Sequence, residues 1–418
     1  MASLSRAALA RPAFSPVAEQ RSGAPQETRR GPAARSVGPH DDDGSRLHLG
    51  DTRTEFSPRV IIDVFDRPRS RQQDARAERR YQVEALRAYG RTLAPAGSNL
   101  AKCGRVSRSL MLQVTRSATG TTSIAGLVTC GSVWACPVCA GRVQLQRAAE
   151  LTLLVERARA DALGTCMVTL TVRHGLGHEL RSTRAGVLRA WKHVLQSRAW
   201  KRIRERYQVA GYVRAVEVTH GRAGWHPHIH VLLLSGRPAD MERNLHAELS
   251  GLWRAAVVLK LGREHEPDDA HGCHVAPAYA ADYIAKMGLE IAYSVAKVRG
   301  PSRSPFELLA DASRGDAQSR VLWCDYVSAT KGARQLEWSR GLRARFGLAE
   351  VTDEELAARA AEEQQAETLL EFSRSQWEAL NRAGGVLRLL MHGDAGASPV
   401  AMRAELERLI REHERQAG

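Results

Sequence analysis

Long apolar runs are missing from this sequence: none approaches the roughly 20 residues that a membrane-spanning helix needs. Cysteine is also sparse, with seven residues in a chain of 418. Small secreted proteins that are held together by disulfides use cysteine far more densely. We therefore exclude a disulfide scaffold and an extracellular protein, and we expect no membrane partner. The expected location is the reducing cytoplasm of a bacterium.

Acidic residues are scarce at the N-terminus, where residues 1–30 are rich in Arg, Ser and Ala. This composition is typical of an organelle transit peptide or of a disordered arm. The high Arg, Ala and Gly content of the whole chain indicates a GC-rich bacterial genome, which favours the arm.

Positive charge is what the sequence has in excess: 61 Lys and Arg face 46 Asp and Glu, for a net charge of +15. Because Arg pairs bidentately with phosphate, this balance favours a nucleic-acid partner. A GC-rich genome raises the Arg content as well, so charge indicates the partner and says nothing of the fold.

Composition and periodicity divide the chain into four parts. Residues 1–75 are rich in Pro, Gly, Ser, Arg and Asp without a sustained period, which predicts a disordered basic arm. Residues 76–150 combine a helix with a cysteine-bearing module. Residues 151–348 carry the most regular pattern and are the expected catalytic domain, and residues 349–418 form a charged helical tail.

The expected catalytic domain alternates strands and helices in the order β-α-β-β-α-β, followed by a further helix. We expect strands at 165–172, 211–219, 226–234 and 272–275, and helices at 180–206, 238–258 and 278–291. This order is that of the split βαβ arrangement, an α+β fold whose antiparallel sheet has helices on one face.

The stretch GWHPHIHVLLL places His226, His228 and His230 at alternate positions of one expected strand. Alternate side chains of a strand share a face, so the three imidazoles project together while the intervening apolar residues pack behind them. Neighbouring imidazoles are typical ligands of a divalent metal ion.

A third ligand is expected from the preceding strand. If the hairpin turns near residues 222–223, Glu217 falls opposite His228 with its carboxylate aimed at the same point. The alternative is a surface strand whose histidines only form hydrogen bonds. Mixed N/O ligation favours Mn²⁺ by affinity, while cellular abundance favours Mg²⁺.

Downstream, Tyr279, Tyr283 and Lys286 lie along one face of an expected helix. A phenol is a poor nucleophile unless a positive group stabilises the phenolate, which Lys286 and a nearby metal would do. On its own this pattern is weak evidence, because a helix with two packed tyrosines is the commoner case.

These motifs together resemble the plasmid rolling-circle replication initiators of the HUH endonuclease superfamily, in their actinobacterial form. The similarity covers about residues 100–345 and excludes the arm and the tail. Its matching segments are MVTLTVRH (167–174), GWHPHIHVLLL (224–234), YAADYIAK (279–286), CGSVWACPVC (130–139) and ATKGARQLEWSRGL (329–342).

The resemblance implies that His228 and His230 bind Mg²⁺ or Mn²⁺ and that Tyr283 attacks the phosphorus of the DNA backbone. The products are a 5′-phosphotyrosine and a free 3′-hydroxyl for the polymerase. Some initiators of the family have a glutamate where this chain has Tyr279. Tyr279 is therefore either a second nucleophile or a packing or phosphate-binding residue.

The cysteine-bearing module contains Cys103, Cys130, Cys136 and Cys139, the last two as a CxxC pair. Four thiolates would complete a tetrahedral structural zinc site. The alternative, a free or redox-active CxxC pair, lacks the surrounding thioredoxin-like elements.

A cluster of basic residues follows the tyrosine helix and surrounds an aromatic residue. This pattern suits the binding of a nucleic acid, because cations contact the phosphate backbone and an aromatic ring stacks on unpaired bases. Its predicted DNA-binding residues are Lys331, Arg334, Trp338, Arg340 and Arg343.

Together these features predict an enzyme that nicks and rejoins one DNA strand at an origin presented as a single strand or a hairpin. It would work with a host helicase and polymerase, and its C-terminal helices would serve in homodimerisation or partner docking. The alternatives are an HUH transposase or relaxase with the same chemistry, and a non-catalytic zinc-ribbon DNA-binding regulator.

Overall fold

The computed structural model describes residues 69–118, 120–278, 302–359 and 367–417. All of them belong to the second of two compact units, Arg67–Gly418. Helix α1 (Arg69–Thr92) begins inside the range expected for the arm, and the rest of that range lies outside the described residues. Within the described ranges, no helix combines the length and the apolar character needed to cross a bilayer.

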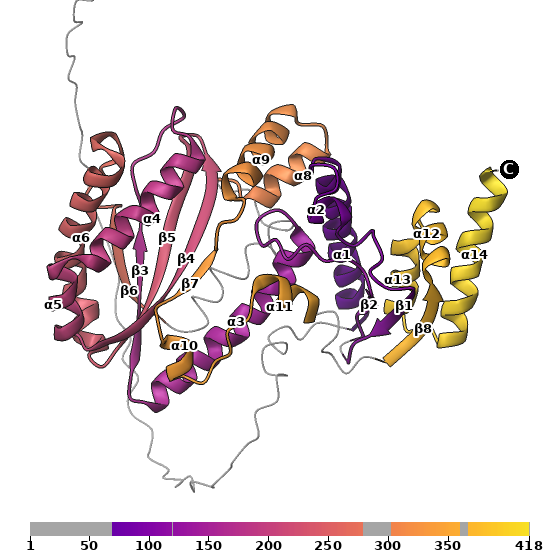
Figure 1. Cartoon of the computed structure of the whole chain (residues 1–418), viewed down its shortest axis with the longest axis horizontal. Coiled ribbons are helices and arrows are strands. Elements are labelled where there is room, and N and C mark those ends of the chain that lie inside the picture. Colours follow the sequence, from indigo (N-terminus) through magenta and orange to yellow (C-terminus); the bar gives the residue numbers. More distant parts are fainter. Residues whose placement is uncertain (1–68, 119, 279–301, 360–366, 418) are drawn as a thin grey trace, which may run out of the picture. The chain divides into compact units, whose positions relative to one another are not determined.

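A five-stranded sheet is the centre of the described structure, with strand order β6–β3–β5–β4–β7 and antiparallel neighbours throughout (Figure 1). The first four strands reproduce the predicted split βαβ arrangement, which is thereby confirmed. Strand β7 adds an edge that the sequence analysis did not find. The strands are β3 (Gly164–Leu170), β4 (Val209–Gly221), β5 (Gly224–Ser235), β6 (Cys273–Pro277) and β7 (Leu336–Trp338).

Helices cover both faces of this sheet, whereas the sequence pattern predicted helices on one face only. On one face, α4 (Leu180–Gln196) and α6 (Pro238–Leu261) bury the odd-numbered apolar residues of β5, such as Val231, as predicted. On the other face, α3 (Pro137–Ala160) packs on Leu232 and its neighbours (Figure 1). Strand β5 is apolar on both faces after its histidines because both faces are covered there.

The single helix expected at 180–206 is two helices, so that prediction is wrong in this respect. Helix α4 ends at Gln196, and α5 (Arg198–Arg206) starts after Ser197, whose backbone is extended (φ −75°, ψ 150°). The Ser197 hydroxyl accepts a hydrogen bond from the Trp200 amide at 3.0 Å and so caps α5. Serine satisfies the free amides of a helix N-terminus and thereby favours a new helix start.

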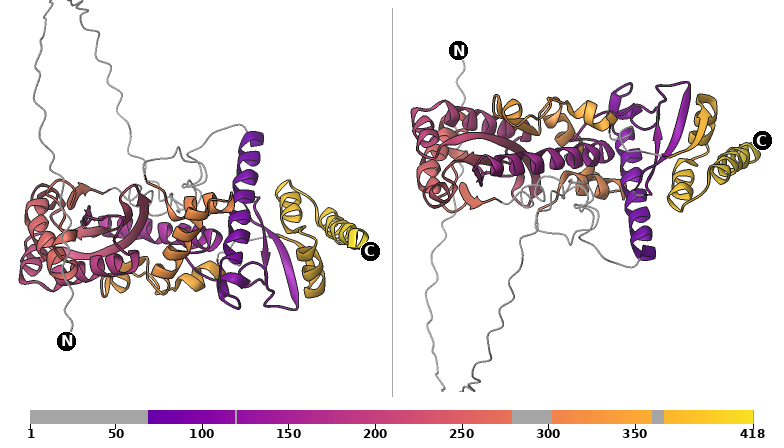
Figure 2. Two further views of the ribbon diagram at one scale, coloured as in Figure 1. Left: turned by 90° about the horizontal axis from the view of Figure 1, so that it is seen from above. Right: turned by 90° about the horizontal axis from the view of Figure 1, so that it is seen from below.

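The remaining long helix, α1, contacts α3 and α8 on one side and α13 on the other (Figure 2). Helix α11 packs against α3. The other elements of this region are α2 (Asn99–Lys102), the 3₁₀ turn Arg263–His265, α8 (Pro305–Ser313), α9 (Ala317–Thr330), α10 (Leu342–Arg345) and α11 (Asp353–Arg359).

A second sheet joins the cysteine-bearing module to the tail. Its order is β2–β1–β8, so Leu112 of β1 pairs with Phe372 of β8 across about two thirds of the chain's length. With the tail helices these strands enclose a separate apolar core. Strand β8 is an element of the predicted helical tail that the sequence analysis missed. The elements are β1 (Met111–Arg116), β2 (Thr122–Ala125), β8 (Glu367–Ser373), α12 (Arg374–Arg382), α13 (Val386–Asp394) and α14 (Pro399–Ala417).

The cap between α4 and α5 can be tested directly. We expect Ser197→Ala to lower the free energy of unfolding by about 1 kcal/mol, because the Trp200 amide loses its acceptor. Ser197→Asp keeps an acceptor at the N-cap and should stay within about 0.5 kcal/mol of the wild type. Urea unfolding followed by circular dichroism measures both, and equal stability of all three proteins would contradict the assigned cap.

Candidate functional site

The β4–β5 hairpin positions the predicted metal ligands. Gly221 pairs with Gly224, which leaves residues 222–223 as a two-residue turn, and Glu217 lies opposite His228 in the register. Gly224 has φ +86°, a conformation that favours glycine at the hairpin end. The predicted turn and the predicted pairing of Glu217 with His228 are both confirmed.

One carboxylate oxygen lies between two imidazoles. Glu217 Oε2 is 2.9 Å from His228 Nε2 and 2.8 Å from His230 Nε2. The far side of each ring is held as well: His230 Nδ1 lies 2.9 Å from Thr169 Oγ1, and His228 Nδ1 lies 3.3 Å from the carbonyl oxygen of His226. Such outer contacts fix the ring orientation and leave the two Nε2 atoms as the ligand atoms.

The electrostatics of this group favour an ionised carboxylate. Burial raises the pKa of Glu217, but the hydrogen bonds and charges of His228 and His230 more than offset that effect and hold the pKa well below its usual range. Both imidazoles are buried, at 8% and 6% exposure, so the group is shielded from competing water.

The three side chains fit a divalent metal ion. Their ligand atoms all lie within 4.8 Å of one another, and two nitrogens with one anionic oxygen form a donor set that binds first-row and alkaline-earth cations. Three protein ligands leave coordination positions open for a substrate, which is the pattern of catalytic rather than structural sites.

His226, predicted as a further ligand, is not brought into this group. Its ring stacks on that of His174, with centroids 4.4 Å apart and planes 8° from parallel, and it lies 4.8 Å from the ring of His228. Burial, and then the neighbouring His228 and His174, lower its pKa to about 4. The imidazole of His226 therefore extends the row of ligand histidines along the sheet, and its low pKa keeps it neutral at pH 7.

A cavity of about 50 Å³ borders Glu217 and His230 and is also lined by Trp134, Gln144 and Tyr326. Gln144 comes from α3 and is 6% exposed, and its Oε1 atom is buried without a hydrogen-bond partner. The cavity is large enough to hold ordered water, which would satisfy this amide and connect it with the carboxylate of Glu217. No sequence motif indicates a role for Gln144, because only the packing of α3 on the sheet brings it here.

Four cysteines form a second group of metal-ligating side chains. Cys103 Sγ lies 3.8 Å from that of Cys136 and 3.6 Å from that of Cys139, and Cys130 Sγ lies 3.7 Å from that of Cys139. A tetrahedral zinc–sulfur site with bonds of 2.3 Å has edges of about 3.8 Å. The predicted convergence of the four thiols is confirmed, and their spacing fits a metal ion.

The predicted catalytic residues Tyr279, Tyr283 and Lys286 lie outside the described residues. The chain on either side of them is attached to the sheet that carries the histidines: the Thr165 hydroxyl of β3 donates to the carbonyl of Ala278 at 2.6 Å, and the Arg303 amide donates to the carbonyl of His220 at 2.8 Å.

The predicted DNA-binding residues divide into two sets. Lys331, Arg334 and Arg340 are exposed, as a DNA contact requires. Arg343 is only 4% exposed, and its guanidinium lies 4.1 Å from the centre of the Trp338 ring.

The prediction for Arg343 is wrong, because its charge is used inside the protein. Its Nη2 atom lies 2.9 Å from Glu150 of α3, and a further nitrogen donates to the carbonyl of Ala349 at 2.6 Å. Trp338 is half-buried beneath the same guanidinium. A basic residue beside an aromatic one in the sequence does not reveal which of them faces the interior.

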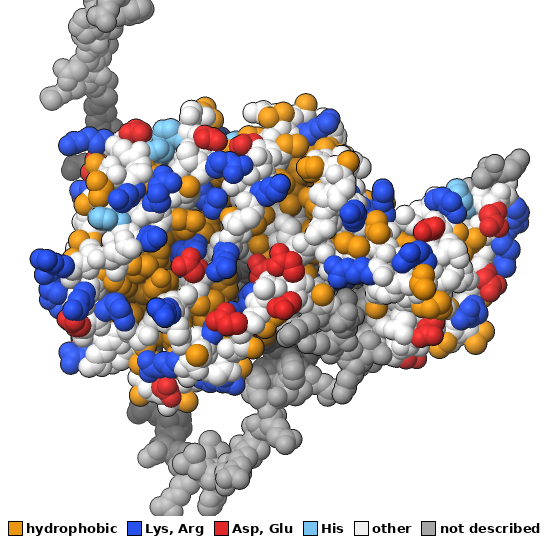
Figure 3. All heavy atoms as spheres, viewed as in Figure 1, with side chains coloured by type: hydrophobic (Ala, Val, Ile, Leu, Met, Phe, Trp, Pro, Cys, Tyr) orange, Lys and Arg blue, Asp and Glu red, His pale blue; other side chains and the backbone are white. Residues whose placement is uncertain are grey.

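A separate basic surface lies on α5. Its aromatic residue, Trp200, is buried against Trp191 with ring centroids 5.6 Å apart, and so cannot stack on a base. The cations of α5 point into solvent and gather at the left edge of Figure 3. The exposed residues without a described acidic partner are Arg198, Lys201, Arg202 and Arg204.

Comparison with known proteins gives three relatives and one family. Residues 123–258 match the family Rep_1, described as replication protein. A Protein rep from Streptomyces lividans is 30% identical over 306 residues, which cover 56% of this chain and 67% of that protein. A neomycin resistance protein from Streptomyces cyanogenus is 35% identical over 31% of this chain and 35% of its own length. A Protein rep from Streptococcus pneumoniae is 30% identical over 24% and 31%, respectively. No solved structure matches.

The low pKa of His226 makes stability depend on pH. Because its pKa of about 4 lies below the value of about 6.5 in an unfolded chain, its contribution is complete above pH 6.5 and is lost as the pH falls through 4. In the metal-free wild type, the free energy of unfolding should fall by on the order of 3 kcal/mol between these two pH values because of His226, and we expect His226→Gln to remove this difference. NMR titration of the imidazole and urea unfolding at several pH values measure both quantities, and a pKa of 6 or above would contradict the burial argument.

Gln144 is expected to support the carboxylate of Glu217 in the group that Glu217 forms with His228 and His230. We expect Gln144→Met, which keeps the volume and removes the amide, to weaken Mn²⁺ binding by roughly tenfold, the low end of effects from outer contacts of metal sites. Gln146→Met on the same helix is the matched control, since Gln146 does not line this cavity. Isothermal titration calorimetry with Mn²⁺ reads out both, and equal affinities would show that the amide has no part in the site.

Proposed function

The chain belongs to the Rep family of replication proteins, and from this membership we propose that it initiates rolling-circle replication by nicking and rejoining one DNA strand at an origin. The observation that carries the proposal is the group of Glu217, His228 and His230 on the β4–β5 hairpin. Its donor set fits a catalytic divalent metal, and the resemblance identified in the sequence assigns such a metal to this histidine pair.

Mg²⁺ or Mn²⁺ is the proposed ion, and when bound it would neutralise the non-bridging oxygens of the scissile phosphate and make its phosphorus more electrophilic. The imidazoles of His228 and His230 and the carboxylate of Glu217 would hold this ion. Thr169 orients the His230 ring, and the buried surroundings of the hairpin exclude water from it. A positive charge that is already in place before the substrate binds requires no rearrangement of the site during the reaction.

Tyr283 is the proposed nucleophile, by resemblance to the third motif of the initiators. Its phenolate oxygen attacks phosphorus, a new P–O bond to tyrosine forms, and the bond to the 3′ oxygen breaks. That oxygen takes up a proton and becomes the 3′-hydroxyl that a polymerase extends. Since the phosphodiester energy is retained in the tyrosine ester, the strand can be rejoined by the reverse reaction without ATP.

Lys286 is the proposed stabiliser of the phenolate, and Tyr279 is the proposed second nucleophile. A lysine one helical turn from a phenol lowers its pKa by favouring the charged form. Two tyrosines would let the protein alternate nucleophiles between the cleavage that starts a round and the one that ends it.

Zinc is the proposed ion of the four cysteines, because thiolates at tetrahedral spacing select it. We also retain the division into an arm (1–75), a zinc module (76–150), a catalytic domain (151–348) and a tail (349–418) as a proposal. The proposed partners are single-stranded or hairpin origin DNA, a host helicase and polymerase, and a second copy of the chain.

A covalent-adduct assay tests the proposed reaction. The protein is incubated with Mn²⁺ and a 5′- or 3′-labelled origin oligonucleotide. A labelled adduct that resists SDS is expected with the 3′ label only, because the 5′-phosphotyrosine is formed on the fragment that lies 3′ to the nick. Tyr283→Phe should abolish the adduct while single-strand binding stays within twofold, because only the nucleophilic oxygen is lost.

The same assay separates the alternatives. Tyr279→Phe should still form the first adduct but fail to release it in a second cleavage, and the double variant should form none. An adduct on transposon ends or transfer origins, and on no replication origin, would indicate a transposase or relaxase. A wild type that binds DNA and forms no adduct on any such strand would indicate a non-catalytic regulator.

A further inference from the structure

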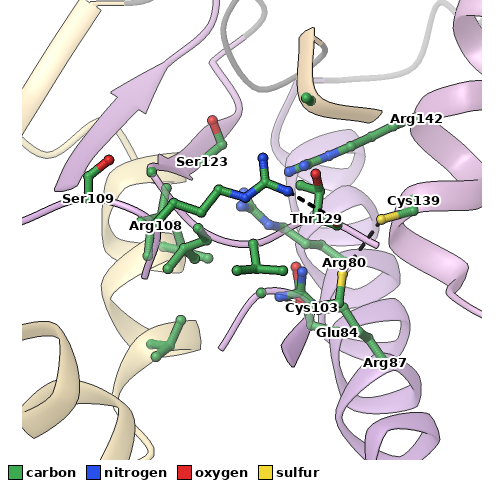
Figure 4. A pocket seen from close by; sticks show the side chains of 18 residues that line it. Arg80, Glu84, Arg87, Cys103, Arg108, Ser109, Ser123, Thr129, Cys139 and Arg142 are labelled. Carbon is green, nitrogen blue, oxygen red and sulfur yellow. Dashed lines mark hydrogen bonds and ion pairs between the residues drawn. The ribbon is translucent and has the colours of Figure 1, made fainter. Parts of the chain in front are cut away.

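A cavity of about 150 Å³ is lined by Cys103 and Cys139 of the cysteine group (Figure 4), and none of Glu217, His228 and His230, the His–Glu group, lines it. It is formed by α1, the segment that precedes β1, the end of β2, α3 and α13. Its volume is many times the roughly 10–15 Å³ that one water molecule needs. The polar residues that line it are Arg80, Glu84, Arg87, Arg108, Ser109, Ser123, Thr129 and Arg142.

Two of its four guanidinium groups are already balanced by acidic partners. Arg80 Nη1 lies 2.9 and 2.7 Å from the two carboxylate oxygens of Asp394. Arg87 pairs with Glu84 and also faces the cysteine thiols. Burial lowers the pKa of its guanidinium, but Glu84 and then the thiols raise that pKa above its ordinary value. These two cations therefore serve the fold and the cysteine group.

The other two, Arg108 and Arg142, have no acidic partner among the described residues. Within the described ranges, Arg108 reaches only the carbonyl oxygen of Thr129, at 3.4 Å, and Arg142 has no hydrogen bond or ion pair. Figure 4 shows both side chains pointing toward the same space next to Thr129, one from the strand side and one from α3. The two guanidinium groups repel each other where they converge, because no described carboxylate pairs with either of them.

An anion would remove this repulsion. Each guanidinium offers a planar fork of N–H donors that suits the oxygens of a phosphate, and the hydroxyl of Thr129 lines the same cavity. Arg108 and Ser109 are exposed, so the cavity is open to solvent on the side of the segment that precedes β1. A phosphate that belongs to a polymer can enter there while the rest of the polymer stays outside.

We propose that Arg108 and Arg142 bind a backbone phosphate of DNA at this cavity, a contact outside the nicking site. The proposal rests on the proposed function for its choice of DNA over other phosphates. It gives the cysteine group a specific role, because Cys136 caps α3 and Cys139 lies in its first turn, one turn before Arg142. The same group also holds Cys103, five residues before Arg108.

Salt-dependent binding tests the proposal. The full-length chain is titrated into a fluorescein-labelled oligothymidylate of 20 nucleotides, which contains no origin, between 50 and 300 mM NaCl. For single strands, log K falls with log salt by about 0.7 for each phosphate neutralised. We expect the double variant Arg108→Gln/Arg142→Gln to bind roughly tenfold more weakly at 100 mM NaCl, with a slope shallower by about 0.7.

The matched control removes the same charge from the same two segments. Arg105→Gln/Arg159→Gln changes two exposed arginines, one in the segment before β1 and one on α3, and neither lines the cavity. Its slope should stay within 0.3 of the wild type. Arg108→Lys/Arg142→Lys should restore the slope, because lysine keeps the charge, and so separates lost contact from lost folding.

Two further measurements decide between the sources of the phosphate and between this proposal and the nicking reaction. Stabilisation of the wild type by inorganic phosphate relative to chloride, with unchanged DNA binding in the double variant, would identify a free-phosphate site and overturn the proposal. An equal slope for wild type and double variant would overturn it as well. The covalent adduct on a short origin strand is measured in parallel. If it forms while the slopes are equal, only this contact fails; if no protein forms it but the slopes differ, only the nicking fails.

Discussion

A single carboxylate oxygen shared by two imidazoles depends on the register of the β4–β5 hairpin. A slip by one residue would turn Glu217 to the opposite face of β4, while His228 and His230 would stay together on theirs. The register is held from the other face of β5, where Ile229, Val231 and Leu233 are wholly buried beneath α4 and α6. The apolar core on one side of the sheet thus determines the geometry of the polar group on the other.

Helix α3 connects this group to the cysteine group. It begins directly after its N-cap residue Cys136, carries Gln144 to the cavity beside Glu217, and then buries Leu151 and Leu154 against the sheet. Its middle is fixed by charged contacts: Arg147 pairs with Asp353 at 2.9 Å and with Glu150 at 2.8 Å, and Glu150 also accepts from Arg343. Removing one member of this partly buried network leaves the others without a partner, so the helix resists displacement. An ion that orders the four thiols would therefore order one end of the helix that borders the metal group.

The features that could be predicted from the sequence are those set by local periodicity. Alternate histidines, a two-residue turn and an acid at the matching distance suffice to place Glu217 opposite His228, because hairpin register follows from turn length. The split βαβ order was also predictable, because the periodicities of strands and helices are local features of the sequence. The break at Ser197 was missed because one serine cap interrupts an otherwise continuous helical pattern. Strand β8 was missed because its partner β1 lies far away in the sequence. Arg343 and Gln144 were missed for a similar reason. Whether each faces solvent or the interior depends on how α3 packs, and α3 is distant in the sequence from both the basic cluster and the hairpin.

The two ligand groups differ in the property by which they would select an ion. Four thiols at tetrahedral spacing, three of them buried, form a closed, soft site, in which selection comes from the ligand type itself. The His–Glu group has two nitrogens and one oxygen, and such a set binds Zn²⁺ more tightly than Mn²⁺ or Mg²⁺ by the general order of affinities. Affinity alone would therefore place zinc in both groups. The group on the hairpin offers only three ligands and cannot close around an ion, so its occupant follows the supply of free metal. In the proposed assignment, the thiols take the scarce ion permanently, and the hairpin group exchanges the abundant one.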